Sequence, residues 1–228
     1  MRTAILKALM LIASGDRELV NILGVTARMS LSSSLIAMLI GVPLGILLGA
    51  YFFPGRKALV VIARTLSGMP PVVCGLIFYM LFSGVGPLGF TGWLFTIRIM
   101  ILAQIVLITP IVISQMESYV TGIISGVRET AVGMGLPHRR ILRLLINESG
   151  YHVLATYLLA FSRAIAEVGA VAMVGGAIVW KTNVMTTAIM QYTNRGDFTL
   201  GVALGIILLI VALIVNLVVS IAQRRWNP

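Results

Sequence analysis

The chain has 228 residues, of which 59% are hydrophobic and only 11% charged, with a mean hydropathy of +1.04. A soluble domain carries about 25% charged residues, so this composition predicts a protein whose main solvent is lipid. The formal net charge is +10. The basic residues lie between hydrophobic runs rather than together on one soluble face, which excludes nucleic acid as a partner. The single cysteine, Cys74, excludes an intrachain disulfide and a cysteine-based metal site.

Residues 1–22 are expected to form a segment distinct from the rest. Met1-Arg2 and the short apolar run 8–13 resemble a secretory signal, but no small-residue cleavage site follows. We interpret the segment as an amphipathic helix that lies on the outer membrane surface in contact with lipids. A cleaved signal remains the alternative. Residues 23–225 then form the transmembrane domain.

Charge-poor runs predict an all-α, polytopic membrane protein. A helix needs about 20 residues to cross the hydrocarbon core. The runs predict about five spans, near residues 28–52, 60–82, 93–118, 150–175 and 199–222.

The distribution of basic residues predicts the orientation of these spans. One side of the membrane receives clusters close to span ends, namely Arg56, Lys57, Arg64, Arg128, Arg139, Arg140, Arg143, Arg224 and Arg225. The basic residues of the other side are scattered and lie among acidic residues. The positive-inside rule therefore predicts that the N-terminus is outside and the C-terminus inside.

The loop at residues 121–148 is basic and broken by glycine. We expect a short helix from Glu129 to Gly135, and then a turn forced by Gly133, Gly135 and Pro137. The following run, 138–147, alternates arginines and aliphatic residues with helical spacing, so it predicts an amphipathic helix. Such a helix fits a groove on a partner protein, or anchors at lipid headgroups through its arginines.

Two features inside the predicted spans are candidates for the transport pathway. Arg163 and Glu167 are four residues apart, which places them on one face of a continuous helix as an ion pair. Their role is either a gate that offers the arginine to an anion or a structural lock of the bundle. Pro70 and Pro71 predict a helix break beside the pathway, with a simple kink as the alternative.

Three motifs resemble a known family. Glu129, Ala131 and Gly135 have the spacing of the cytoplasmic loop of permease subunits from binding-protein-dependent ATP-driven (ABC) importers, although Thr130 replaces an alanine and the Leu-Pro end is absent. The segment 69–75, with its proline pair, and the segment 161–170 resemble molybdate and sulfate permeases. The tail from Met185 to Phe198 resembles tungstate-type permeases.

The resemblance implies a type I ABC importer permease with the function of carrying tungstate or a related oxyanion. The residues that it assigns to ATPase coupling are Glu129, Ala131, Gly133, Gly135, His138 and Arg139. It implies a homodimer, two ATP-binding subunits and an extracytoplasmic oxyanion-binding protein, in the inner membrane of a prokaryote. Molybdate, sulfate or another solute is the alternative substrate. The alternatives from other classes are an ion-coupled secondary transporter or channel subunit, and a membrane anchoring subunit.

We expect no catalytic residue, metal site or cofactor in the chain itself. The sequence lacks the glycine-rich loop with a lysine that binds nucleotide phosphates. His138 and His152 lack neighbouring ligands with metal spacing. ATP is therefore expected to be hydrolysed by a separate subunit.

Overall fold

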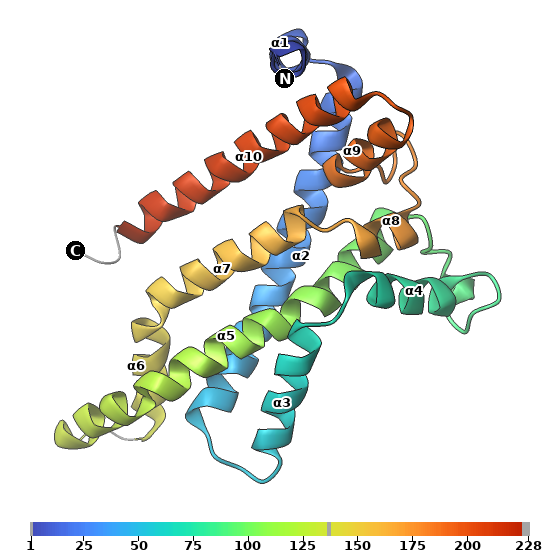
Figure 1. The fold of residues 1–228 in the computed structure, drawn as a ribbon. Helices are drawn as coiled ribbons and strands as arrows, with labels where there is room; N and C mark the ends of the chain where they lie inside the picture. The colour runs from blue at the N-terminus through green and yellow to red at the C-terminus, as the bar shows by residue number, and fades with distance from the viewer. Residues whose placement is uncertain (1, 136–137, 225–228) are drawn as a thin grey trace.

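The computed structural model describes residues 2–135 and 138–224, and within these ranges every regular element is a helix, as predicted. Figure 1 labels the elements in chain order. Their bounds are α1 Arg2–Ser14, α2 Arg17–Ala50, α3 Arg56–Ser67, α4 Pro71–Phe82, η1 Gly89–Thr91, α5 Ile97–Gly133, α6 His138–Glu148, α7 Gly150–Ile165, α8 Gly169–Gly175, α9 Met185–Asn194 and α10 Phe198–Arg224.

Three of the described helices, α2, α5 and α10, are long and apolar enough to cross a membrane alone, and the count reaches five if each of two bent pairs is one span. The span predicted near 60–82 consists of two helices, because α3 and α4 meet at a bend of 97°, at the proline pair where a helix break was predicted. The span predicted at 150–175 is also broken, by 53° between α7 and α8. The segment 93–96 is not helical, so the span predicted at 93–118 begins late, at Ile97, and continues to Gly133.

The long helices α2 and α5 pack in parallel and form the spine of the fold (Figure 1). Gly41, Gly45 and Gly49 face Val112, Met116 and Val120, respectively, so the two helices stay in register over two turns. A Cβ atom added at Gly45 would lie 2.5 Å from the Cβ atom of Met116, closer than such atoms come. Small residues in this stripe let the helix backbones approach, which is how helices associate where lipid removes the hydrophobic driving force.

A buried polar contact joins the spine to α7. The Ser33 hydroxyl on α2 donates to Oε1 of Gln104 on α5 at 2.6 Å, and Nε2 of Gln104 donates to the Ala164 carbonyl of α7 at 2.8 Å. Gln104 is almost completely buried. Because an unpaired amide in an apolar interior is costly, this contact fixes the relative position of three helices.

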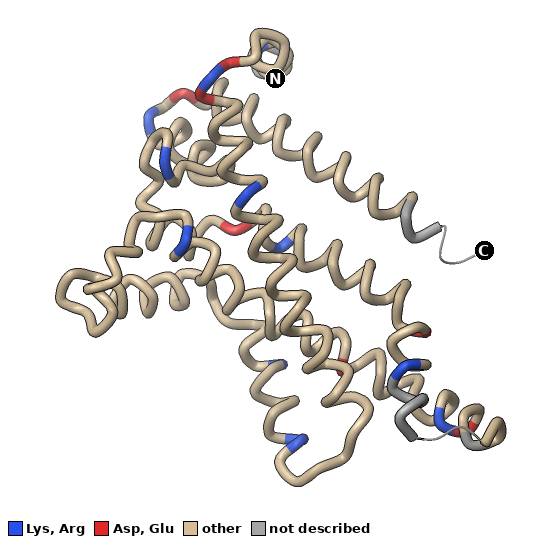
Figure 2. The backbone as a smooth tube through the Cα atoms, turned by 180° about the vertical axis from the view of Figure 1, so that it is seen from behind, with Lys and Arg blue, Asp and Glu red and all other residues tan. Residues whose placement is uncertain are grey.

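Charged residues and bare apolar surface are separated in space. The turn between α2 and α3 and the last turns of α5 lie at the same end of the molecule, and α1 and α9 lie at the other (Figure 1). Figure 2 shows no charged residue on α4, nor on α10 up to the part drawn in grey, and residues 198–221 contain none. Both helices expose large apolar side chains, including Leu209 and Leu213 on α10 and Val72 and Met80 on α4. Such surfaces require a cover of lipid or protein.

The N-terminal helix α1 packs against α10 and exposes an apolar face. Ala8 is buried in a core cluster with residues of α2, α9 and α10, and Lys7 forms an ion pair with Asp197 at 3.6 Å. The exposed side chains of α1 include Ile5, Leu9 and Met10. The next helix, α2, already begins at Arg17, so the boundary predicted between 1–22 and 23–225 falls inside a helix.

Candidate pathway and coupling sites

The two helix breaks of the structure pack directly against each other. A Cβ atom added at Gly75 of α4 would lie 2.8 Å from the Cα atom of Ala170 in α8. One added at Gly169 would lie 2.8 Å from Cγ2 of Val72. A larger residue at Gly75 would require movement of the backbone at Ala170, and one at Gly169 would require movement of the Val72 side chain. Glycine at both positions therefore lets the beginnings of α4 and α8 touch, and the two breaks form one junction.

Pro70 and Pro71 produce the first break, as the sequence predicted. Pro70 has extended backbone angles and precedes the helix, and Pro71 is the first residue of α4. Proline is favoured at this position because the first N–H groups of a helix have no partner within it. The pair therefore starts a new helix in a new direction. Neither proline interrupts the backbone hydrogen bonds inside α4, because both lie at its beginning.

Arg163 and Glu167 meet as predicted, but not on one helix face. Nη2 of Arg163 lies 3.6 Å from Oε2 of Glu167. However, α7 ends at Ile165, so Glu167 lies in the second break, where Oε1 accepts a hydrogen bond from the Ala170 backbone N–H at 3.1 Å. The Thr186 hydroxyl donates to the Glu167 carbonyl at 2.9 Å. The prediction failed because the helical spacing of the two residues assumes a helix that the chain interrupts.

The two partners of this pair differ in exposure. The Glu167 side chain is 4% exposed, whereas that of Arg163 is 38% exposed. A charge within a membrane-spanning segment faces protein or water, because exposure to lipid costs about 2.5–3.5 kcal/mol even on the mildest scale. Arg163 therefore marks the side of the junction that faces water or a further protein chain.

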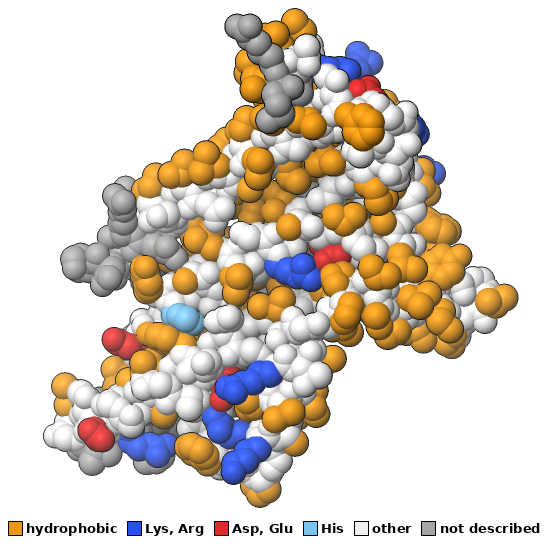
Figure 3. Space-filling model, viewed as in Figure 1, with side chains coloured by type: hydrophobic (Ala, Val, Ile, Leu, Met, Phe, Trp, Pro, Cys, Tyr) orange, Lys and Arg blue, Asp and Glu red, His pale blue; other side chains and the backbone are white. Residues whose placement is uncertain are grey.

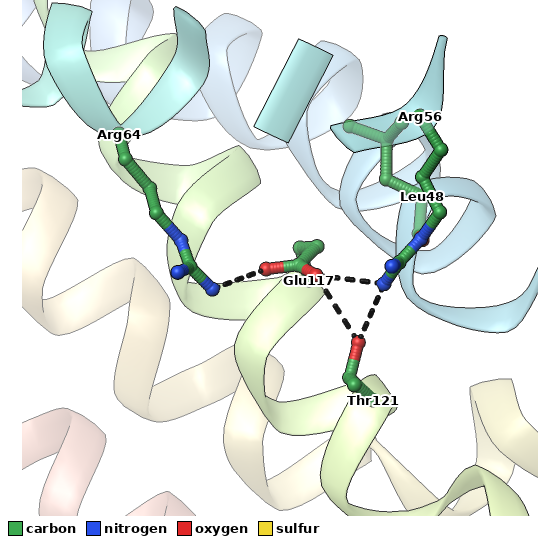
Figure 4. Close-up of polar contacts among 5 residues, drawn as sticks. All are labelled: Leu48, Arg56, Arg64, Glu117 and Thr121. Carbon is green, nitrogen blue, oxygen red and sulfur yellow. Dashed lines mark hydrogen bonds and ion pairs between the residues drawn. The ribbon is translucent and has the colours of Figure 1, made fainter. Parts of the chain in front are cut away.

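A second cluster of charges, which the sequence reasoning missed, surrounds Glu117 of α5 (Figure 4). Oε1 of Glu117 accepts from Nη2 of Arg56 at 2.9 Å, and Oε2 accepts from Nη2 of Arg64 at 3.0 Å. The Thr121 hydroxyl lies 3.2 Å from Oε1. Both arginines come from α3, so one carboxylate ties α3 to α5. The available signal was an acidic residue inside an apolar run, since a buried charge requires a partner.

The last turns of α5 carry the first coupling residues. The separate short helix predicted from Glu129 is wrong, because α5 runs unbroken for 37 residues to Gly133. The predicted turn follows it, and Gly135 has a φ of +63°. This left-handed conformation is accessible to glycine at little cost and ends helices. The loop 121–148 therefore consists of the end of α5, the turn and α6.

The helix α6 folds back onto α5. Leu145 of α6 and Ala131 of α5 are buried in the same core cluster. Ala131 therefore packs rather than offers a surface for docking. Glu129, Gly133 and Met134 are exposed. Met134 was not among the residues predicted to couple to the ATPase. His138 begins α6, but the side chains of His138 and Arg139 lie outside the described residues, and so does Pro137.

A groove of about 600 Å³ lies beside this loop between α5 and α6. Its walls include Gly122, Gly126 and Thr130 of α5 and Leu144 and Glu148 of α6. The glycines have open space where a side chain would stand. The described part of the loop thus combines an exposed end with a neighbouring concave surface.

Comparison with known proteins identifies relatives along most of the chain. Residues 41–228 match the family described as binding-protein-dependent transport system inner membrane component. A probable anion ABC transporter permease protein of Haloferax volcanii is 35% identical, over 84% of this chain and 86% of its own length. The tungstate uptake system permease protein TupB of Peptoclostridium acidaminophilum is 32% identical, over 86% of each chain.

More distant similarity extends to sulfate permeases and to a solved structure. The sulfate transport system permease protein CysW of Escherichia coli K12 is 26% identical, over 83% of this chain and 69% of its own length. A chain of the inward-facing MetNI methionine ABC transporter superposes with a TM-score of 0.75, over 92% of this chain and 97% of its own. Its sequence is 20% identical, so this likeness concerns the fold.

Proposed function

Because the chain belongs to the family of inner membrane components of binding-protein-dependent transport systems, we propose that it forms the path for tungstate in an ABC importer. Two observations support this substrate. The relatives at 32% and 34% identity are tungstate uptake permeases, and a half-exposed arginine lies at the helix junction. Family membership removes the two alternatives from other classes, an ion-coupled transporter and an anchoring subunit.

The observation that carries the proposed pathway is the junction of two helix breaks beside Arg163. Discontinuous helices near the bilayer midplane build the substrate sites of many transporters, because irregular backbone is tolerated there only where it lines a cavity or meets protein. Pro70 and Pro71 form the break between α3 and α4 on one side of the junction. On the other side, Glu167 accepts a hydrogen bond from the Ala170 backbone N–H in the break between α7 and α8. In this arrangement Arg163 offers a transient partner to a passing anion, while Glu167 serves mainly as structure.

The chain needs partners to carry out transport. A separate ATPase subunit hydrolyses ATP and docks at the exposed end of the loop 121–148, through Glu129, Gly133 and Gly135, and through His138 and Arg139. An extracytoplasmic binding protein delivers the anion at the opposite end. Five spans enclose a pathway poorly, so two copies of this chain related by a two-fold axis, with one ATPase each, complete the importer.

In the proposed orientation of the chain, the loop 121–148 and the turn between α2 and α3 lie in the cytoplasm and the N-terminus lies outside. In support, Arg56, Lys57 and Arg64 of α3 and the basic loop share one end of the molecule (Figures 1 and 2). The helix α1 lies at the other end, where its exposed Ile5, Leu9 and Met10 rest in the outer lipid surface.

Uptake into reconstituted vesicles tests the substrate. The chain is combined with its ATPase and with a binding protein that prefers tungstate or one that prefers molybdate, and uptake of each labelled anion is measured. These dianions have nearly equal size, so we expect the complex to import whichever anion is delivered. Selectivity that stays with the permease would reveal a binding site within the pathway. Import of sulfate or another solute alone would overturn the assignment of tungstate.

A further inference from the structure

A second arginine stands in the same relation to the helix junction as Arg163. Arg163 lies in the last turn of α7, which ends at the second break, and Arg64 lies in the last turn of α3, which ends at the first. Because the two breaks touch, the two arginines approach one junction along different helices. In Figure 3, Lys and Arg side chains over α3 and α5 lie on the same face as those near the α7–α8 junction.

The two arginines that share Glu117 differ in how many of their N–H donors are free to bind a further group. Arg56 is 13% exposed and donates to the Leu48 carbonyl, to Glu117 and to the Thr121 hydroxyl. Its guanidinium also lies 4.9 Å from the ring centre of Phe52. The Arg64 side chain is 59% exposed, and the only hydrogen bond of its guanidinium to a described residue is the one from Nη2 to Glu117. Arg56 is thus fixed within the protein, whereas Arg64 keeps Nε and Nη1 available (Figure 4).

The charge of the cluster also favours an anion. Two guanidiniums share one carboxylate that is 4% exposed, so the cluster keeps a net charge of one positive unit. Arginine is the residue best suited to oxyanions, because its planar fork donates two parallel hydrogen bonds. Arg64 lies about 12 Å along α3 from Arg56, in the last turn before the junction. The helix α3 runs from the turn after α2, at the end of the molecule that also carries the end of α5, to this junction (Figure 1).

We propose that Arg64 is a second contact for the transported oxyanion, on the cytoplasmic side of Arg163, and that Glu117 competes with the anion for its guanidinium. This inference rests on the proposed function. A pathway requires sites that bind an anion well enough to receive it and weakly enough to release it. Because Glu117 is already in place beside Arg64, it takes back the guanidinium when the anion leaves. The opposing explanation is that Arg64 only ties α3 to α5 and offsets the dipole at the end of α3.

The test measures tungstate binding and transport in the reconstituted complex. Arg64→Gln leaves the Arg56–Glu117 pair intact, and Lys57→Gln removes an exposed charge from the same helix as a matched control. Equilibrium binding of labelled tungstate to the detergent-solubilised complex, without the binding protein, is measured beside uptake. We expect Arg64→Gln to weaken binding about ten-fold, the effect of one hydrogen bond to a charged group, and to lower uptake, while Lys57→Gln matches the wild type.

A second variant separates competition from simple attraction. In Glu117→Gln the guanidinium of Arg64 loses its competing carboxylate, so we expect tighter tungstate binding together with a lower maximal rate of uptake and a lower KM. A purely structural tie predicts no gain in binding. Arg64→Lys is expected to restore part of the binding, since the charge returns without the fork.

The outcomes distinguish the two proposals. If the wild-type complex imports no tungstate, the proposed function fails. If the wild type imports tungstate and Arg64→Gln binds and imports it equally well, Arg64 is not an anion contact and the inference is overturned, whatever the behaviour of Glu117→Gln.

Discussion

The Cα atom of Gly45 on α2 lies so close to Met116 on α5 that an added Cβ atom would be 2.5 Å from the Met116 Cβ atom and 2.9 Å from the Ile113 carbonyl oxygen. This contact is the midpoint of the packed stripe between the two helices. The backbones of α2 and α5 therefore lie close together at this point, and a side chain added at position 45 would overlap atoms of α5.

We therefore expect Gly45→Val to destabilise the protein by more than the 1–3 kcal/mol typical of overpacking, because one of the opposing atoms belongs to the backbone. Gly24 is in the same helix with open space around it, so Gly24→Val is the matched control and should have little effect. Thermal unfolding of the detergent-solubilised chain measures both. Equal stability of the two variants would mean that α2 and α5 do not pack as described.

The turn after α5 should depend on Gly135. Its φ of +63° costs other residues about 1–2 kcal/mol, so Gly135→Ala should weaken association with the ATPase several-fold and lower transport. Gly84, which follows α4 and lies outside the loop 121–148, also has open space and no positive φ, so Gly84→Ala should retain both activities. Co-purification of the ATPase and uptake assays provide the measurements. A normal Gly135→Ala variant would argue against docking through this turn.

At the helix junction, loss of Glu167 should harm stability more than loss of Arg163. Glu167 is buried and accepts a hydrogen bond from the Ala170 backbone N–H as well as pairing with Arg163. Glu167→Ala thus leaves a donor unpaired and should cost about 1–3 kcal/mol, whereas Arg163→Ala leaves Glu167 with its backbone partner. The melting temperatures of the two variants decide the order. The reverse order would make the ion pair with Arg163, rather than the hydrogen bond from the Ala170 backbone N–H, the main role of Glu167.

The orientation is open to labelling with a membrane-impermeant thiol reagent in a Cys74→Ser background. Lys57, at the start of α3, and Lys181, in the loop between α8 and α9, are both exposed, and the proposal places them on opposite sides of the membrane. Lys57→Cys should react only from the cytoplasm and Lys181→Cys only from outside. Reaction of both from one side would show that a bent helix pair does not cross the membrane.

Limited proteolysis of intact vesicles tests the position of α1. Met10 and Leu9 are exposed on its apolar face, so Met10→Asp should release α1 from the lipid surface, while the insertion of the five spans persists. Protease sensitivity of residues 1–16 in intact vesicles should rise. A Thr3→Asp variant, on an exposed polar position of the same helix, serves as the control and should leave the sensitivity unchanged.

The sequence by itself determined that the chain is helical and membrane-embedded, where the apolar runs lie, and that a proline pair and a glycine turn interrupt them. These are local properties. The free energy of transfer into lipid depends on composition within one segment, and proline and glycine act on the backbone at their own positions. The same local signals failed at the break after Ile165, because nothing near Arg163 and Glu167 announces the end of that helix.

Only the tertiary structure decided which distant residues meet. Glu117 is visible in the sequence as a lone acid that requires a partner, yet its partners Arg56 and Arg64 lie 61 and 53 residues away. The contact of Gly169 with Val72, and hence the union of the two breaks, has no sequence signal at all. Such pairings depend on how whole helices fit together at close range, since the shapes of both surfaces decide the contact and neither helix alone contains that information.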